Sequence, residues 1–146
     1  MRNAKPLSMR PMIDAFPRSL QLAALAGLCS ISSSAFAATV SFIEPADGAR
    51  LGRTFAVKFA VTGMLVQPAG QLSAASGHHH LIIDGGPVAT GEMVPFDERH
   101  VHFGNGQTEA RVMLAPGTHR LTLQFSDGAH QSYGPELSNT ITVTVD

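Results

Sequence analysis

The sequence holds little that could bind through sulfur, since Cys29 is its single cysteine, and it has no tryptophan. Cys29 lies inside an apolar run near the N-terminus, and the cleavage that we predict after Ala37 would remove it. The remaining domain would then contain neither a disulfide nor a thiolate ligand. This lack excludes cysteine-based zinc sites, blue-copper sites and thiol catalysis.

A long hydrophobic run is also missing. The apolar run over residues 20–31 is shorter than the roughly 20 residues that a membrane span needs. It follows Arg and Lys residues at positions 2, 5, 10 and 18 and precedes Ala35-Phe36-Ala37, which is typical of a signal peptide. We therefore expect residues 1–37 to be cleaved, with translation starting at Met1, Met9 or Met12. The mature protein would be periplasmic or secreted, without a membrane span.

Positive charge is scarce in the predicted mature domain, residues 38–146. This domain contains six Lys and Arg residues and ten Asp and Glu residues, which gives a formal net charge of −4 with neutral histidines. Nucleic-acid binding depends on phosphate neutralisation by Lys and Arg, so this composition excludes nucleic acid as a partner. The length suits one domain with its own core.

Helical periodicity is absent too, because no apolar stripe at helical spacing extends over ten residues of the mature chain. Short alternating runs separated by Pro, Gly, Asp and Asn predict strands instead. Residues 64–77 have no clear period and are expected to form a long loop or a broken edge strand. The spacing favours an all-β, immunoglobulin-like or fibronectin-type β-sandwich of about seven strands. The predicted strands cover residues 39–44, 54–62, 79–84, 108–114, 118–126 and 140–145, with 101–103 as a further candidate.

What the domain does contain is histidine, and all seven histidines lie between positions 78 and 130. Side chains two residues apart in a strand share a face and are about 6.5–7 Å apart at Cα. His78 with His80, and His100 with His102, could therefore each present two imidazoles to one metal ion. The predicted ligands are His78, His80, His100, His102, His119 and His130.

Imidazole ligands suit copper and zinc, and for an exported protein without thiolates we expect copper rather than zinc. The predicted role is storage or delivery of the metal rather than catalysis. Asp97, Glu98, Glu109 and Asp127 lie near histidines in the sequence and could orient imidazoles by accepting the second N–H. Three methionines of the mature domain are expected to pack in the core rather than extend a copper site: Met64, Met93 and Met113.

Two alternatives stay open. In the first, the domain is a structural or partner-binding module of the cell envelope, with a protein or glycan partner, and its histidines form a metal-free hydrogen-bond network. His119, in register with Leu121 and Leu123, could be a hydrogen-bonded histidine at the core edge. In the second, the domain is a metalloenzyme, which would need an open coordination position and a neighbouring acid or base.

Four ordered motifs give the chain a resemblance to a known family. They are GHHHLIID at 77–84, HFGNGQTE at 102–109, LAPGTHRL at 114–121 and DGAH at 127–130. With these motifs the mature domain resembles the bacterial family called domain of unknown function 4399. The resemblance implies an exported, compact β domain whose histidines belong to the family's motifs, and it implies no particular activity.

Overall fold

The computed structural model describes residues 37–146 of the chain. The predicted signal peptide therefore lies outside the described residues, apart from Ala37. Residues 37–146 contain no helix long and apolar enough to cross a membrane. Their elements are β1 (Thr39–Glu44), β2 (Arg50–Leu51), β3 (Thr54–Thr62), β4 (Leu65–Val66), β5 (Ser76–Ile83), β6 (His100–His102), β7 (Glu109–Met113), β8 (Gly117–Ser126), the 3-10 helix η1 (Pro135–Leu137) and β9 (Ser138–Val145).

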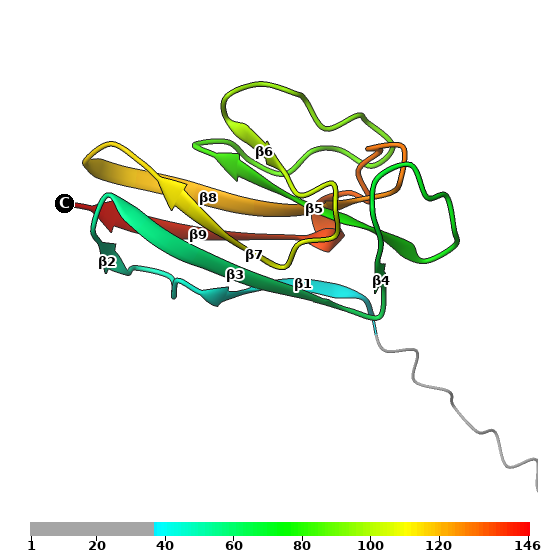
Figure 1. Ribbon diagram of the computed structural model, residues 1–146, viewed down its shortest axis with the longest axis horizontal. Helices are drawn as coiled ribbons and strands as arrows, with labels where there is room; N and C mark the ends of the chain where they lie inside the picture. The colour runs from blue at the N-terminus through cyan, green and yellow to red at the C-terminus, as the bar shows by residue number, and fades with distance from the viewer. Residues whose placement is uncertain (1–36) are drawn as a thin grey trace, which may run out of the picture. The chain divides into compact units, whose positions relative to one another are not determined.

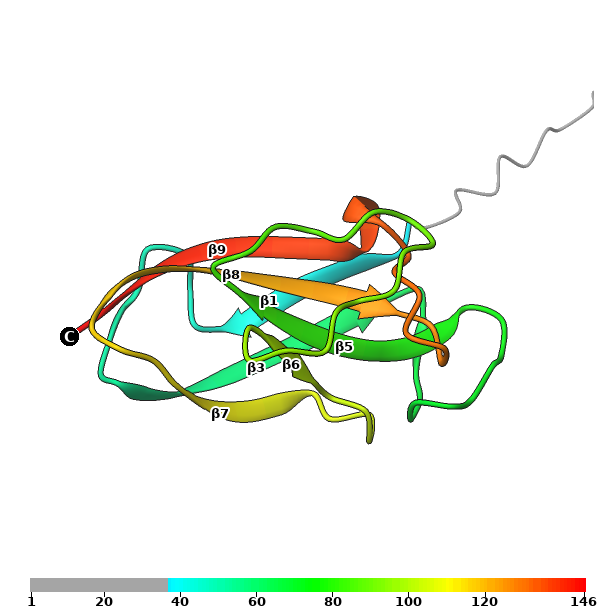
Figure 2. The same cartoon turned by 90° about the horizontal axis from the view of Figure 1, so that it is seen from above.

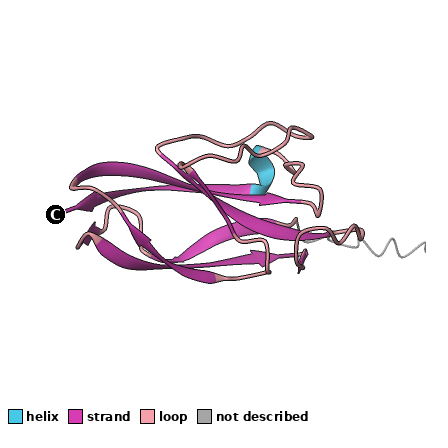
Figure 3. Ribbon diagram, turned by 45° about the horizontal axis from the view of Figure 1, so that its top comes forward, coloured by secondary structure: helices cyan, strands magenta, loops and turns pink. Residues whose placement is uncertain are grey.

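The strands form two sheets in a sandwich-like arrangement (Figure 1, Figure 3). The smaller sheet has the order β1-β3-β7, and the larger has the order β2-β9-β8-β5-β4. Strand β5 pairs with β8 along one edge, while β4 and β6 pair with different parts of its other edge. The all-β class and the sandwich-like packing of two sheets are thus confirmed.

Alternating side chains build the core between the two sheets. Phe55, Val57 and Phe59 of β3 face this core and are almost fully buried. From the larger sheet they meet Leu123 and Phe125 of β8, which are also fully buried. Burying each such side chain stabilises the fold by about 1.5–3 kcal/mol.

The outer face of the larger sheet is polar, yet it is buried as well. Thr122, Gln124 and Ser126 alternate with the core residues of β8 and have no exposed surface. Residues 84–99 and 127–137 cover this face (Figure 2), and hydrogen bonds tie the cover to β8. Gln124, for example, accepts from the Val88 N–H through its Oε1 and donates through its Nε2 to the Gly134 carbonyl. His78 and His80 of β5 lie on this covered polar side.

Most strand bounds follow the predicted ones closely, with identical bounds for β1 and β3. Strand β5 starts at Ser76 rather than at residue 79, because Gly77 pairs with β4 and His78 with β8. Residues 64–77, expected to form a long loop or a broken edge strand, contain the two-residue strand β4 at the edge of the larger sheet. Strands β2 and β4 are too short to show a periodic pattern, which is why the predicted number of strands was lower.

Candidate metal centre

The three consecutive histidines of β5 separate onto the two faces of the sheet. His79 faces the core, where its ring centroid lies 4.7 Å from that of Phe59 and 4.9 Å from that of Phe125. His78 and His80 face the covered polar side, with ring centroids 4.8 Å apart. Strand alternation therefore places the first predicted pair on one face, as the spacing indicated.

Strand pairing brings a third histidine to this pair. In the antiparallel register of β5 with β6, His102 lies opposite His80. Their rings stack with centroids 5.0 Å apart and an interplanar angle of 28°. The pairing of β5 with β8 places Ser126 opposite His78.

The fourth histidine, His130, comes from the turn that follows β8. Its backbone is left-handed, with φ of 67°, a conformation that costs a non-glycine residue about 1–2 kcal/mol. The Asp127 carboxylate accepts the N–H groups of Ala129 at 2.8 Å and Gln131 at 2.9 Å, and its carbonyl accepts that of His130 at 3.0 Å. These bonds hold the turn in the shape that directs His130 toward His102.

Nitrogen atoms from His78, His80, His102 and His130 all lie within 4.8 Å of one another. The Nε2 of His102 is 3.1 Å from the Nε2 of His78 and 3.0 Å from the Nε2 of His130. A ring nitrogen carries either one hydrogen or one in-plane lone pair, so it forms one good hydrogen bond and not two. By contrast, nitrogens bound to one metal ion at about 2.0–2.1 Å would lie roughly 3.3 Å apart in a tetrahedral site. The two spacings at His102 Nε2 are close to that value.

The two buried members of this histidine cluster have nitrogens that the protein leaves unpaired. Among residues 37–146, His80 Nε2 and His78 Nδ1 have no hydrogen-bond partner, and both side chains are at most 1% exposed. Leaving a buried polar group without a partner costs about 1–3 kcal/mol. The other nitrogen of His80, Nδ1, lies 3.1 Å from the buried hydroxyl of Ser126. A ligand bound by Nε2 would satisfy the unpaired atom while the hydroxyl accepts the Nδ1 hydrogen.

Burial keeps these imidazoles neutral. It lowers the pKa of His78 to about 4, with further lowering by charge on His102 and His130 and an opposing effect of Asp127. Burial and then charge on neighbouring histidines lower the pKa of His80 to about 2. The pKa of His102 is lowered by the same two causes, burial first. Neutral imidazole is the form that binds a metal ion, so three of the four rings are ready to bind at neutral pH.

Two glycines make room for the cluster. A Cβ at Gly104 would collide with the imidazole of His102, and one at Gly77 would collide with the backbone carbonyl of Ser126. Gly104 lies in the motif at 102–109, and Gly77 directly precedes the histidine triplet in the motif at 77–84. Both glycines are therefore explained by close approach of backbone to the site.

The structure does not bring His100 into the cluster, contrary to the prediction. In the β5–β6 register His100 lies opposite Ile82, two residues along the strand from His102, which lies opposite His80. Its Nδ1 donates instead to the Asp97 carboxylate at 2.7 Å. His100 and His102 share a face of β6, as the spacing indicated. The β5–β6 register and the hydrogen bond to Asp97 nevertheless hold His100 away from the cluster.

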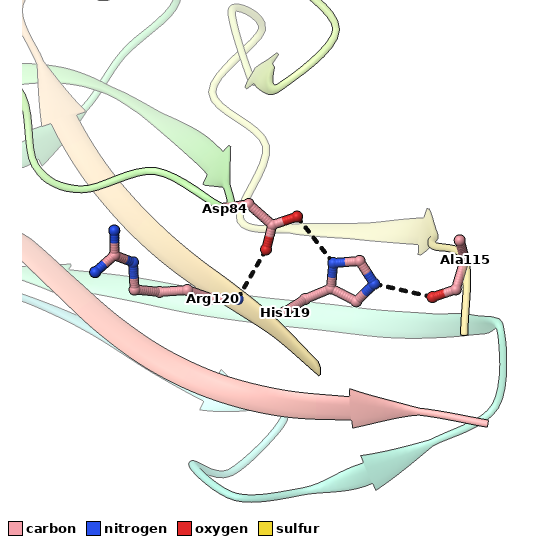
Figure 4. A network of polar contacts seen from close by, with 4 residues as sticks. All are labelled: Asp84, Ala115, His119 and Arg120. Carbon is pink, nitrogen blue, oxygen red and sulfur yellow. Dashed lines mark hydrogen bonds and ion pairs between the residues drawn. The ribbon is translucent and has the colours of Figure 1, made fainter. Parts of the chain in front are cut away.

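His119 is also placed away from the cluster, and Figure 4 shows its partners. Its Nδ1 donates to Asp84 at 3.0 Å and its Nε2 to the Ala115 carbonyl at 2.9 Å, while Asp84 also accepts the Arg120 N–H at 3.0 Å. His119 precedes Ser126 by seven residues on β8, which is about 24 Å of strand, and an odd separation places it on the opposite face. Its two hydrogen bonds agree with the alternative interpretation of a hydrogen-bonded histidine at the core edge.

Acceptors on both nitrogens favour the charged form of His119. The hydrogen bond to Asp84 first, and then that to the Ala115 carbonyl, raise the pKa of His119. Burial opposes ionisation of Asp84, but the hydrogen bonds from His119 and the Arg120 backbone outweigh it and lower the pKa of Asp84. The two groups form an ion pair that ties the end of β5 to the start of β8.

Other residues near the cluster differ from expectation. Ser126 and Phe96 contact the cluster but were not predicted as site residues. The polar residue at position 126 in the alternating pattern of β8 could have indicated Ser126. No feature of the sequence indicated Phe96. Met93 and Met113 were expected in the core, but they are 62% and 76% exposed. Met64 packs against the core, as expected.

Comparisons with known proteins add a family. Residues 57–146 match the family described as "Domain of unknown function (DUF4399)". No curated protein matches the chain. Among solved structures, the chain is similar to the endo-β-1,4-mannanase from Thermotoga petrophila, with 18% identity and a TM-score of 0.43. That similarity covers 75% of this chain and 20% of the mannanase chain, so the chain spans about a fifth of that enzyme's length.

Proposed function

We propose that this chain, which belongs to the DUF4399 family, binds one transition-metal ion through His78, His80, His102 and His130. The observation that carries the proposal is the convergence of four imidazole nitrogens, two of them from fully buried rings. The proposed role is storage or delivery of the metal in the periplasm or outside the cell.

Copper fits this ligand set better than zinc. All four ligands are neutral imidazoles, so the charge of a bound ion stays uncompensated within the cluster. The cost of burying an ion rises steeply with its charge, which favours monovalent copper over divalent zinc. Imidazole itself serves both metals.

Storage or delivery fits better than catalysis. A catalytic metal keeps an open coordination position, whereas four protein ligands are typical of a closed site. Here two ligands are buried beneath the covering segments, and the other two are partly buried. We therefore propose a protein that holds its ion rather than one that turns over a substrate.

Metal titration of the purified protein tests this proposal. Cu(I), under reducing conditions, and Zn(II) are each titrated against wild type, H80A and H102A, with H119A as the matched control outside the cluster. We expect one Cu(I) per chain, at least tenfold weaker binding by H80A and H102A, and unchanged binding by H119A. Equal affinity in all four proteins would contradict the assignment of ligands.

One observation favours the metal-free alternative. Either the 3.0 Å or the 3.1 Å spacing at His102 Nε2 is also the distance of a hydrogen bond between two imidazoles. In that case the cluster would rigidify an envelope domain that binds a partner. A thermal melt decides between the two, because an ion bound by the native state must raise the melting temperature. An unchanged melting temperature with saturating Cu(I) and Zn(II) would support the metal-free network.

A further inference from the structure

The histidine cluster is unequally shielded from solvent. His78 and His80 are at most 1% exposed, because β8 and the covering segments surround them. His102 and His130 are partly exposed. An ion therefore reaches the four nitrogens from the side of His102 and His130.

Phe96 stands on that side and contacts both of these rings. Its ring centroid lies 5.5 Å from that of His102 and 4.9 Å from that of His130, at interplanar angles of 72° and 66°. Both are edge-to-face contacts within the favourable range for aromatic pairs. Phe96 itself is 61% exposed, so its ring covers the cluster without being enclosed.

The backbone fixes where this ring stands. Val94, two residues earlier, is fully buried, and its N–H donates to the carbonyl of His130 at 3.0 Å. Met93 forms a bridge with Gln131 on the same stretch. On the other side of Phe96, the Asp97 carboxylate accepts the Arg99 N–H at 2.8 Å and the ring N–H of His100. Phe96 is thus held between two anchors, one of which includes a residue of the cluster.

We propose that Phe96 is the gate of the histidine cluster and sets the rate at which a metal ion enters and leaves. This inference rests on the proposed function and concerns exchange rather than affinity. A phenyl ring offers no ligand atom, so its removal leaves the four nitrogens in place. An exposed side chain changes rotamer within nanoseconds, which is far faster than release of a bound ion. The exchange rate then scales with the fraction of time that the ring is turned away.

The two ring contacts set the size of the effect. A tenfold lower population of the open ring corresponds to about 1.4 kcal/mol, which two aromatic contacts can supply. We therefore expect F96A to speed both entry and release of the ion about tenfold. Because both rates rise together, the dissociation constant stays unchanged.

Metal transfer measures this effect. Protein loaded with Cu(I) is mixed with excess of a chromophoric Cu(I) chelator, and the rate of colour formation is compared for wild type, F96A, F96L and M113A. Met113, a more exposed apolar residue on the smaller sheet, is the matched control. The expected order is F96A fastest, F96L intermediate, and M113A equal to wild type. A rate for F96A within twofold of wild type would overturn the proposal, as would a dissociation constant that weakens by the same factor as release accelerates.

A measurement without metal separates this proposal from the proposed function. Diethylpyrocarbonate acylates accessible imidazoles, and peptide mapping by mass spectrometry gives the rate at each histidine. In metal-free F96A, acylation of His102 and His130 should be several times faster than in wild type, with His119 unchanged. If wild type binds no metal but this acceleration occurs, the proposed function fails, while control of access to the cluster by Phe96 is supported. Equal rates in both proteins would remove the gate.

Discussion

Two histidine environments lie near the two ends of β8, and they differ in the kind of atom that faces each ring and in how deeply the rings are buried. Near its start, both nitrogens of His119 face oxygen acceptors, and its pKa is raised. Near its end, the rings of the cluster face one another, and burial, with charge on the neighbouring histidines, lowers the pKa of His80 to about 2. In the first environment the charged ring of His119 is fixed by its two acceptors. In the second, neutral rings keep nitrogen lone pairs available for a metal ion. The partners of a histidine, rather than its mere presence, therefore indicate a metal ligand.

The largest effect is expected from G104A. A methyl group at this position would collide with the His102 imidazole, so the ring must leave its place in the cluster. Metal affinity should fall by about 100-fold, and titration with Cu(I) measures it. G52A is the control, because a Cβ at Gly52 has no atom within 4 Å among the described residues. Equal loss in both variants would show that the cluster does not depend on this corner.

Acid should weaken the metal-free fold through the cluster. In the folded protein the pKa is about 4 for His78 and about 2 for His80, both below the ordinary value of 6.5. Below pH 6.5 the unfolded chain therefore binds more protons than the folded protein does. The free energy of unfolding should then decrease as pH falls from 6.5 toward 4. From pH 7 to pH 5 the expected loss is about 2 kcal/mol for each of these two histidines.

Urea unfolding of the metal-free protein at pH 7 and pH 5 measures this loss. The double variant H78L/H80L removes two of the three buried histidines with a lowered pKa and leaves His79, so it should lose less stability over the same interval. A wild-type free energy of unfolding that stays constant or increases at pH 5 would contradict burial of neutral imidazoles.

A smaller effect is expected from S126A, which removes the hydroxyl beside His80 Nδ1. In the metal-bound state the Nδ1 hydrogen would lose its acceptor, and affinity should weaken about tenfold. S41A, at an exposed serine of β1, should bind as wild type does. If S126A binds equally well, His80 is not a ligand through Nε2, or its orientation does not depend on this hydroxyl.

The smallest effect should come from H119A, and its pH dependence should be opposite. A raised folded pKa means that His119 stabilises fully below pH 6.5 and loses this contribution as pH rises through the folded pKa. The variant should be less stable than wild type by about 0.5–1 kcal/mol at pH 5.5, and by less at pH 9. Chemical denaturation at both pH values gives the comparison, and a larger deficit at pH 9 would contradict the ion pair with Asp84.

Alternation in the sequence was enough to predict the all-β fold and most strands, because the core residues of β3 and β8 repeat every second position. It was not enough for the start of β5. Ser76, Gly77 and His78 show no apolar alternation, since their outer side is buried under other parts of the chain. Burial of a polar face depends on distant segments and leaves no local pattern.

The candidate site was predictable in part for the same reason. Spacing correctly put His78 and His80 on one face, but the partner of His80 is set by the β5–β6 register, a pairing between distant residues. The position of His130 in the cluster depends on a left-handed backbone conformation that residue spacing does not predict. For His119 the signal existed, because its register with Leu121 and Leu123 already indicated the opposite face of β8.

X-ray absorption spectroscopy of the copper-loaded protein tests the central claim most directly, because it counts the ligands of the bound ion. The account predicts three to four imidazole nitrogens at about 2.0 Å, and one fewer in H102A. Two or fewer imidazoles, or a spectrum that H102A leaves unchanged, would contradict it.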